Sequence, residues 1–455
     1  MIHHADDWLT IHGGDVRDIL PTLPSESVDC IVTSPPYWGL RDYGTATWIG
    51  GDEACEHRTD ATGSTQNKGN NNREAAPFRG VCGRCGAFRS DSQLGLEPTP
   101  EQYVANLVGV FRELRRVLKP SGTCWLNLGD SYNAYNGGAG PSSSISAGAS
   151  TTERPQLETG YGLRTKGLKP KDLVGIPWRV AFALQADGWC LRSDIIWAKP
   201  NPMPESVTDR PTKAHEYLFL LTKSARYYYD AEAVAEATLP ASIARYAYGD
   251  PATTRINKGG DYREAWNNGD KHIGVPTVPD NPATRNLRSV WTIATRPDPG
   301  AHFAVFPPEL PERCIKAGSS ERGVCPECGA PWERQIERVT GRDWNAHKTR
   351  EERLTIGNGT GATADKERIL TPHTTTGWLP SCEPLHNNVE HWTSSGIISS
   401  LYPQPIPAVV LDPFAGSGTV GLVANRLSRR AILIDLNPAY LEQQMERNAQ
   451  MPVGL

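Results

Sequence analysis

The sequence predicts an α/β protein built on one open sheet, and three observations support this prediction. Short apolar segments with strand composition alternate with segments of helical periodicity along much of the chain. Two of these apolar segments, one near each end of the chain, run directly into loops of unusual composition. The 455 residues are enough for a large core and more than one domain.

The first elements are predicted from composition and spacing. Trp8–His12 and Cys30–Thr33 are apolar and rich in β-branched residues, so each is expected to form a strand, with a helix or turn over 16–20 between them. Residues 101–119 place apolar side chains at helical spacing, which predicts a long helix. Pro120, followed by Ser and Gly, is expected to stop that helix.

The remaining elements continue the alternation of strands and helices. Further strands are expected at 123–128, 190–198, 217–222, 408–411 and 431–435, and further helices at 177–186 and 419–427. The strand at 217–222 is expected to turn back through 223–226 into 227–229, forming an antiparallel hairpin at the edge of the sheet. Four stretches do not fit a sheet: 52–96, 134–167, 231–300 and 319–405. Of these, 134–167 is rich in Gly, Ser and Thr and is predicted to be a mobile loop.

Composition limits the class of protein. No apolar run is long enough to cross a bilayer, and the first ten residues lack the basic and apolar regions of a signal peptide, which predicts a cytoplasmic protein with no membrane partner. The net charge of −4 gives no support to a nucleic-acid partner. It does not exclude one, because phosphate contacts need only a local basic surface. The pair Arg429-Arg430 is expected to lie on a solvated face.

The late loop has the pattern of a nucleotide-like cofactor site. The sequence VLDPFAGSGT carries a strand into an acid, Asp412, and then into a glycine loop that opens a helix. Glycine lets the backbone approach a ligand, and a helix N-terminus offers free N–H groups. The next strand ends in Asp435, the position from which an acid binds ribose hydroxyls in dinucleotide folds. The loop lacks the Lys of a phosphate-binding loop, so ATP and GTP are not expected.

The early loop interrupts a strand with rigid and aromatic residues. The stretch CIVTSPPYW changes at Ser34 from strand composition to two prolines and two aromatics, and prolines cannot continue a central strand. Together, TSPPYW and DPFAGSGT resemble the catalytic and cofactor motifs of the S-adenosylmethionine-dependent DNA amino-methyltransferases, which modify the exocyclic amine of cytosine or adenine. The catalytic motif comes first and the cofactor motif last, which resembles the permuted β-type arrangement. The resemblance implies a Rossmann-like open mixed sheet of the methyltransferase type.

The resemblance assigns the catalytic corner to Ser34, Pro35, Pro36 and Tyr37. Acceptors on the N–H bonds of a base amine favour the pyramidal geometry needed for attack, and the Ser34 hydroxyl and the Pro35 carbonyl have this capacity. The prolines fix φ, so the corner is held before substrate arrives. Tyr37 is expected to stack on a base flipped out of the duplex. Attack is expected to be direct, because the sequence has no Pro-Cys nucleophile motif.

The same resemblance assigns the cofactor site and the target. The expected cofactor-binding residues are Asp15, Phe306, Asp412, Pro413, Phe414, Ala415, Gly416, Ser417, Gly418, Thr419 and Asp435. Asp15 matches an acid that contacts the cofactor's adenine. Serine at the position of Ser34 favours cytosine N4 as the target, with adenine N6 as the alternative on the same scaffold. The block containing Arg210, His215 and Glu216 also resembles the family, without an assigned role.

The predicted organisation follows from these assignments. Residues 1–230 form the catalytic part of the methyltransferase domain, and 301–455 form its cofactor-binding part. Segment 231–300 is the candidate target-recognition region, with the insertion 319–405 as its rival. Double-stranded DNA is the expected partner, together with a possible cognate restriction endonuclease. A different class remains open, a zinc-stapled DNA-binding protein whose methyltransferase site is inactive.

The cysteines predict structural zinc in two insertions. Two CxxC pairs each have glycine beside the last cysteine, and each is accompanied by a further cysteine and a histidine, which suits tetrahedral zinc. The first set, in 52–96, is Cys55, His57, Cys82 and Cys85; the second, in 319–405, is Cys325, Cys328, Cys382 and His386. An insertion with little core gains folding energy from such a site. The alternative is free thiols in a reducing cell.

Overall fold

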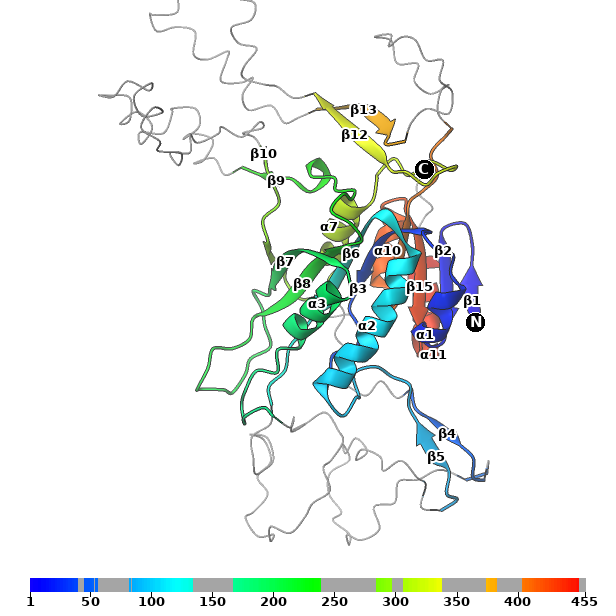
Figure 1. Ribbon diagram of the computed structural model, residues 1–455, viewed down its shortest axis with the longest axis vertical. Helices are drawn as coiled ribbons and strands as arrows, with labels where there is room; N and C mark the ends of the chain where they lie inside the picture. Colours follow the sequence, from blue (N-terminus) through cyan, green and yellow to red (C-terminus); the bar gives the residue numbers. More distant parts are fainter. Residues whose placement is uncertain are drawn as a thin grey trace, which may run out of the picture. The chain divides into compact units, whose positions relative to one another are not determined.

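The structure is a computed structural model that describes most of the predicted strands and helices (Figure 1). The described residues are 1–39, 45–52, 54–55, 82, 84–133, 167–238, 284–296, 306–337, 374–382 and 403–449. The chain divides into two compact units: unit 1 contains Met1–Tyr229, Ser289–Pro331 and Pro405–Leu455, and unit 2 contains Asp230–Arg288 and Trp332–Gln404. The catalytic and cofactor motifs both belong to unit 1.

Unit 1 is built on a mixed nine-stranded sheet. Its strands, in order across the sheet, are β1 (Ile2–Ala5), β2 (Leu9–Gly13), β15 (Arg430–Asp435), β14 (Val409–Asp412), β3 (Val28–Thr33), β6 (Leu118–Leu128), β8 (His215–Thr222), β7 (Cys190–Ala198) and β11 (Val290–Thr292). Strands β2, β15, β14, β3 and β6 are parallel, whereas β8 is antiparallel to both β6 and β7. This architecture confirms the expected α/β fold with an open mixed sheet.

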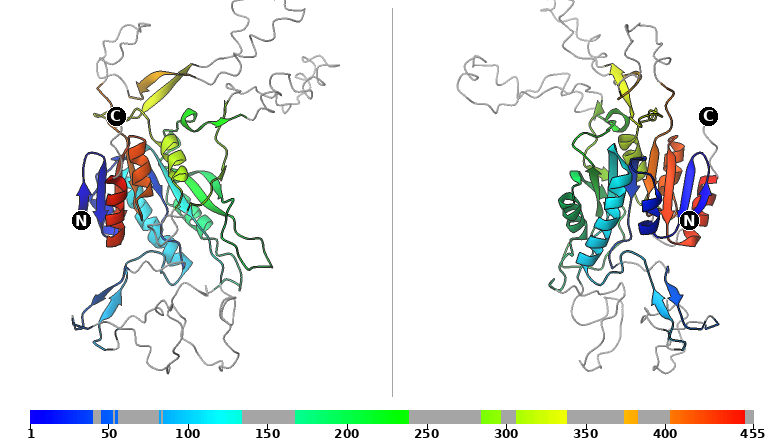
Figure 2. Two further views of the ribbon diagram at one scale, coloured as in Figure 1. Left: turned by 180° about the vertical axis from the view of Figure 1, so that it is seen from behind. Right: turned by 45° about the vertical axis from the view of Figure 1, so that its right-hand side comes forward.

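The chain order explains how the two motifs meet. The C-terminal strands β14 and β15 insert between the N-terminal strands β2 and β3 in the middle of the sheet (Figures 1 and 2). Val410 pairs with Cys30 and Leu411 with Ile31 in parallel register. Because parallel neighbours end at the same edge, the loops that follow β3 and β14 begin side by side.

Helices cover both faces of this sheet. The helices are α1 (Val16–Ile19) with the 3₁₀ turn η1 (Leu20–Thr22), α2 (Pro100–Val117), α3 (Ile176–Ala186), α7 (Glu309–Gly318), α10 (Thr419–Arg426) and α11 (Pro438–Ala449). Helices α1, α2 and α3 share one hydrophobic core with the sheet, while α7, α10 and α11 pack together on the opposite face (Figure 2). No helix among these, or elsewhere in the described part of the chain, has the length and apolar character needed to cross a membrane.

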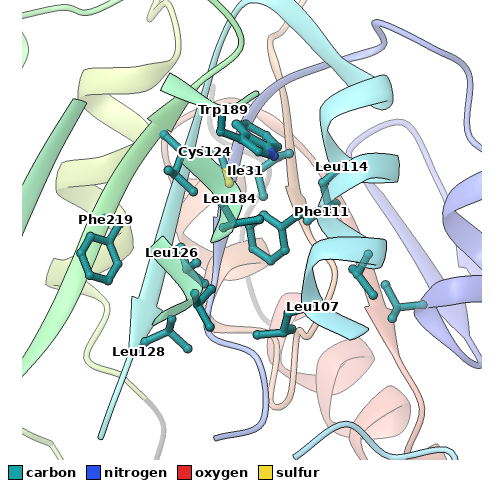
Figure 3. Close-up of a cluster of buried hydrophobic side chains, with 14 of the residues drawn as sticks. Ile31, Leu107, Phe111, Leu114, Cys124, Leu126, Leu128, Leu184, Trp189 and Phe219 are labelled. Atoms are coloured by element: carbon teal, nitrogen blue, oxygen red, sulfur yellow. The ribbon is translucent and has the colours of Figure 1, made fainter. Parts of the chain in front are cut away.

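The core beneath α2 and α3 contains the apolar side chains whose helical spacing predicts a helix at 101–119. Leu107, Phe111 and Leu114 are fully buried on one face of α2, and they meet Leu126 and Leu128 of β6 (Figure 3). Apolar side chains three and four positions apart lie on one helix face, so burial of that face fixes α2 against the sheet. This packing determines the position of the C-terminal end of β6, where the candidate site lies.

A buried ion pair joins β3 to the strands on both sides of it. Asp29 lies in β3, and its carboxylate accepts a hydrogen bond from Lys119 Nζ at 2.8 Å and another from the Val409 backbone N–H at 2.8 Å. The side chains of Asp29 and Lys119 are only 7% and 13% exposed. Burial raises the pKa of Asp29 despite the nearby lysine. A charge buried in this way destabilises the folded protein unless its ion-pair partner is present.

The predicted hairpin and the predicted helix stop differ in detail from the structure. The antiparallel partner of β8 is β7 rather than 227–229, which form no strand, and β11 extends the sheet beyond β7. The Tyr228 N–H instead donates to the Ser121 carbonyl. Pro120 does not open a loop, because β6 begins directly at Leu118. Arg429 is also buried rather than solvated: its guanidinium donates to the Ser319 side chain and carbonyl.

The shorter β elements form separate pairs. Unit 1 also contains the antiparallel pair β4 (Thr47–Ile49) and β5 (Phe88–Ser90). Unit 2 contains β9 (Glu236–Ala237) paired with β10 (Thr284–Arg285), β12 (Trp332–Glu337) paired with β13 (Thr374–Pro380), and the turn η2 (Glu232–Val234). Within unit 2, Arg334 forms an ion pair with the buried Asp230. Of the predicted loop 134–167, residues 134–166 lie outside the described residues.

Candidate active site

The two motif loops open into one pocket of unit 1. Thr33, the last residue of β3, donates from Oγ1 to Asp412 Oδ1 at the end of β14, at a distance of 2.8 Å. This bond joins the strand ends that carry the two motifs. The pocket has a volume of about 770 Å³, and Ser34, Tyr37, Asp435 and residues of the glycine loop all line it. A volume of this size accommodates a drug-sized or nucleotide-sized ligand.

The glycine loop has the backbone conformation that its sequence predicts. Gly416 and Gly418 have φ values of +50° and +77°, which other residues rarely adopt, and Gly418 precedes the first turn of α10. The Gly416 N–H donates to Asp435 Oδ2 at 2.7 Å, so the acid at the end of β15 holds the loop. From α11, Gln444 donates to the Gly416 carbonyl at 2.8 Å and Arg447 donates to Ser417 Oγ at 2.7 Å. The loop is therefore fixed on both sides.

The two strand-end acids are buried and carry raised pKa values. Burial raises the pKa of Asp412 to about 7, an effect that exceeds the opposing hydrogen bonds from Thr33 and the Phe414 N–H. Burial likewise raises the pKa of Asp435 to about 6. A cationic ligand beside these groups favours their ionised forms. Two acids that are poised near neutrality at one cavity suit a cofactor with a positive centre and ribose hydroxyls.

The remaining predicted cofactor residues also lie at this pocket. Asp15, Phe306, Pro413, Phe414, Ala415 and Thr419 line it together with Asp412, Gly416, Ser417 and Asp435. Gly418 is not among the lining residues and acts as the N-cap of α10. Asp15 also caps α1 and forms an ion pair with Arg17 at 2.5 Å, and the hydrogen bonds from Arg17 hold its pKa below the usual value although burial opposes them. Much of the Asp15 carboxylate is therefore occupied by its own helix.

The residues at the cavity fit S-adenosylmethionine. Asp435 presents a carboxylate at the end of β15, Phe414 supplies an apolar surface, and the glycine loop brings backbone close to the same space. When bound, this cofactor supplies an electrophilic methyl group on a cationic sulfur. Tyr37 and Trp197, which also line the pocket, provide aromatic rings of the kind that stabilise a cation.

The catalytic corner is held by a hydrogen bond from α2, by a close packing contact with Gly129 and by a hydrogen bond within the motif. The Tyr103 hydroxyl of α2 donates to the Pro36 carbonyl at 2.9 Å, which fixes the proline corner to α2. The Tyr37 ring lies against Gly129, just beyond β6, with no room for a Cβ between them. The Tyr37 hydroxyl contacts Ser34 Oγ at 3.2 Å. These contacts place Ser34 and Tyr37 at the same pocket as the glycine loop.

Two polar residues at this site, Asn127 and Lys199, are not singled out by the sequence, and a third, Glu216, is expected there only as part of a block that resembles the family without an assigned role. Asn127 of β6 and Glu216 of β8 both lie within hydrogen-bond distance of the Tyr37 hydroxyl, at 3.0 and 2.8 Å. Lys199, just after β7, forms an ion pair with Glu216. All three line the pocket. Asn127 and Lys199 lie at the carboxyl ends of β6 and β7, where open sheets bind ligands. Glu216 lies at the start of β8, and only the antiparallel strand order brings it to the same place.

The first cysteine set is partly assembled. The Sγ atoms of Cys55, Cys82 and Cys85 all lie within 4.8 Å of one another, and those of Cys55 and Cys82 are 3.9 Å apart. The fourth predicted ligand, His57, lies outside the described residues. The Cys82 N–H donates to the Ala87 carbonyl and the Gly86 N–H to the Cys82 carbonyl, which forms a tight turn around the CxxC pair.

The second set is described only in part. Cys325 and Cys328 belong to unit 1, Cys382 belongs to unit 2, and His386 lies outside the described residues. The turn at Cys325 has the same hydrogen bonds as the turn in the first set. The Cys325 N–H donates to the Ala330 carbonyl, and the Gly329 N–H donates to the Cys325 carbonyl. The binding of one zinc ion by all four of these residues remains a prediction.

Three known proteins illustrate what this chain is similar to. Among solved structures, the PvuII DNA methyltransferase, which is described as cytosine-N4-specific, gives a TM-score of 0.44 at 14% identity, covering 98% of this chain and 88% of that chain. The Type II methyltransferase M.Cfr9I of Citrobacter freundii is 39% identical over 310 residues, covering 68% of this chain and 72% of the relative. M.SfiI of Streptomyces fimbriatus is 30% identical over 457 residues, covering 96% and 90%.

A family comparison covers most of the chain. The family model described as DNA methylase, of the N6/N4 methyltransferase type, matches residues 28–325 and 397–446. These ranges contain both SPPY and DPFAGSGT. The chain therefore belongs to the N6/N4 DNA methylase family, the amino-methyltransferases that take their methyl group from S-adenosylmethionine.

Proposed function

We propose that the protein transfers a methyl group to the exocyclic N4 amine of cytosine in duplex DNA, after the base has flipped into the pocket. The observation that carries this proposal is the shared cavity: the SPPY corner and the glycine loop line the same space. A flipped base at Ser34 and a cofactor at Asp435 would therefore meet inside one pocket. The preference for cytosine rests on Ser34 and on the family resemblance of this position.

The residues of the corner suit activation of an amine. The lone pair of a base amine is delocalised into the ring, so the nitrogen is a weak nucleophile until acceptors hold its N–H bonds. We propose that Ser34 Oγ and the Pro35 carbonyl oxygen are these acceptors. Pro36, whose carbonyl is bonded by Tyr103, keeps the corner rigid. We further propose that the Tyr37 ring stacks on the flipped base.

Labelled cofactor tests this function directly. Purified protein is incubated with duplex DNA and S-adenosylmethionine carrying a labelled methyl group, and the digested nucleosides are separated by mass. N4-methylcytosine is the expected product. N6-methyladenine would overturn the choice of target and leave the reaction intact. A protein that binds DNA and zinc but transfers no methyl group would support the inactive, DNA-binding alternative.

We also propose that duplex DNA is read by 231–300 and that the methyl mark protects the site from a cognate restriction endonuclease. The second part is supported by relatives that carry the name Type II methyltransferase. Mapping modified sites on genomic DNA from an expressing cell would identify the sequence. Enzymes that cut that sequence should then fail on the modified DNA. Deletion of 239–283 should abolish site selection while cofactor binding persists.

We propose a structural zinc ion at the first cysteine set. Three thiols within 4.8 Å of one another match a tetrahedral site that lacks one ligand, which we assign to His57. Freshly purified protein should contain at least one zinc per chain. Cys82→Ser should lower that content by one equivalent, whereas Cys190→Ser, at the start of β7, should leave it unchanged. Equal zinc content in both variants would contradict the assignment.

A further inference from the structure

A connected set of polar side chains lies at the base of the catalytic corner. The Tyr37 hydroxyl is 3.2 Å from Ser34 Oγ, 3.0 Å from Asn127 Oδ1 and 2.8 Å from Glu216 Oε2. The other oxygen of Glu216 forms an ion pair with Lys199. These five side chains come from four separate strand ends or loops, and all of them line the pocket.

The hydrogen bonds in this set run in one direction, from Ser34 through Tyr37 to Glu216. A phenol has a single proton to donate. Asn127 donates from Nδ2 to the Tyr217 carbonyl at 3.1 Å, so its oxygen faces Tyr37 as a second acceptor. Glu216 is the closer acceptor and is charged, and hydrogen bonds to carboxylates are the stronger kind. The phenol therefore donates to Glu216 and accepts from Ser34.

The sheet fixes Glu216 in this place. It lies on β8, which is hydrogen-bonded on both sides, and it pairs in register with Trp197 of β7. Its side chain is 17% exposed, and Lys199 balances its charge. A carboxylate held this way is aimed at Tyr37 before any substrate arrives.

Methylation of an amine releases a proton, and the corner must dispose of it. The amine nitrogen forms its bond to the methyl carbon, the methyl–sulfur bond breaks with its electron pair left on sulfur, and the nitrogen becomes cationic until it loses one N–H proton. Ser34 alone does not retain such a proton, because a protonated hydroxyl is a strong acid.

We propose that Glu216 is the final acceptor of this proton, which reaches it through Ser34 and Tyr37. The amine proton moves to Ser34 Oγ, the Ser34 hydroxyl proton moves to the Tyr37 oxygen, and the phenol proton moves to Glu216, which ends as a neutral carboxylic acid. Ser34 Oγ and the Tyr37 hydroxyl oxygen each gain one proton and lose one. This inference rests on the proposed methyl transfer at Ser34, and it adds a role in proton transfer for Tyr37 and for Glu216, which lies outside the SPPY motif.

The electrostatics of Tyr37 agree with a role as a relay. Burial, together with the nearby negative charge of Glu216, raises the pKa of Tyr37 well above its usual value. The phenol consequently stays neutral at physiological pH and keeps a proton to pass on. Tyr37 therefore passes a proton from Ser34 to Glu216 and remains neutral itself.

The test uses variants that keep shape and remove one proton-transfer function each. Tyr37→Phe keeps the ring and removes the hydroxyl, and Glu216→Gln keeps the side-chain size and removes the basic oxygen. Matched controls are Tyr227→Phe and Glu26→Gln, whose side chains do not line the pocket. Single-turnover rates are measured on a duplex carrying the site that wild type methylates. Cofactor affinity and the fluorescence of 2-aminopurine beside the target base report binding and flipping.

Each relay variant should lose about 10²-fold or more in the single-turnover rate constant for methyl transfer. Affinity for DNA, affinity for cofactor and the flipping signal should stay at wild-type values, a split that misfolding would not produce. The double variant should be no slower than the slower single variant, because both remove the same path. A Tyr37→Phe enzyme with the wild-type single-turnover rate would overturn the relay, including the case in which Glu216→Gln alone is slow. Failure of wild type to methylate, or full activity of Ser34→Ala, would instead overturn the proposed function.

Discussion

Replacing Gly129 by alanine should inactivate the enzyme by moving Tyr37. Gly129 is buried directly after β6, and its backbone is outside the left-handed region, so alanine can adopt its conformation. A Cβ at this position would lie 2.5 Å from Tyr37 Cε2 and 2.8 Å from Cδ2, whereas ordinary van der Waals contact begins at 3.4 Å. The ring must therefore retreat by about 1 Å.

This displacement is large compared with the hydrogen bonds that hold the ring. The Tyr37 hydroxyl lies 2.8 Å from Glu216 and 3.0 Å from Asn127, and a bond stretched beyond about 3.5 Å is largely lost. A misplacement of about 1 Å at a catalytic group costs about 10²-fold in rate. We expect a loss of that size in the rate constant of methyl transfer, measured with labelled cofactor under single-turnover conditions. Overpacking should lower stability by about 1–3 kcal/mol, which leaves the protein folded.

Gly109 provides the matched control. It lies on α2, and a Cβ added there would meet no atom within 4 Å outside the backbone of its own helix. Gly109→Ala should keep the wild-type rate and raise stability by about 0.5–1 kcal/mol, because alanine favours the helix. A wild-type single-turnover rate in a folded Gly129→Ala protein would refute the conclusion that the close contact positions Tyr37.

Three further predictions concern stability and cofactor binding. Lys119→Met leaves Asp29 buried without its ion-pair partner, so the free energy of unfolding in urea should fall by about 3 kcal/mol; an unchanged value would mean that water compensates the charge. Asp412 and Asp435 have pKa values raised to about 7 and 6, and each carboxyl becomes ionised above its pKa. Affinity for the cationic cofactor should therefore rise between about pH 5 and 8 in calorimetry, and an affinity that falls over this range would contradict the sign. Thr33→Val removes the 2.8 Å bond to Asp412 and should weaken cofactor binding by about tenfold, which a wild-type affinity would disprove.

Much of the fold and of the cofactor loop could be predicted, because local sequence determines them. A hydrophobic strand that ends in an acid and a glycine loop has few alternatives, and DPFAGSGT forms the expected turn with Gly416 and Gly418 at positive φ. The meeting of SPPY with this loop also followed from the resemblance. The structure adds the reason: β14 inserts beside β3 in parallel, so both loops start at the same edge.

The resemblance marks the block that contains Glu216, but the role of Glu216 and its contact with Tyr37 could not be predicted, because they depend on strand order. Glu216 lies at the start of β8, and only the antiparallel insertion of β8 between β6 and β7 brings that end to the pocket. The expected hairpin with 227–229 does not form. The aromatic composition of 227–229 favours a strand locally, but tertiary packing decides which strands pair. Arg429 was misplaced for a similar reason: its burial depends on Ser319, which is 110 residues away.

The most direct test of the account is methyl transfer by wild type and Ser34→Ala under identical conditions. Labelled S-adenosylmethionine, duplex DNA and mass analysis of the nucleosides report both the rate and the atom modified. Wild type should produce N4-methylcytosine, and Ser34→Ala should be slower by about 10²-fold while binding cofactor as tightly as wild type. Equal rates in the two proteins would contradict the claim that the SPPY corner performs the transfer.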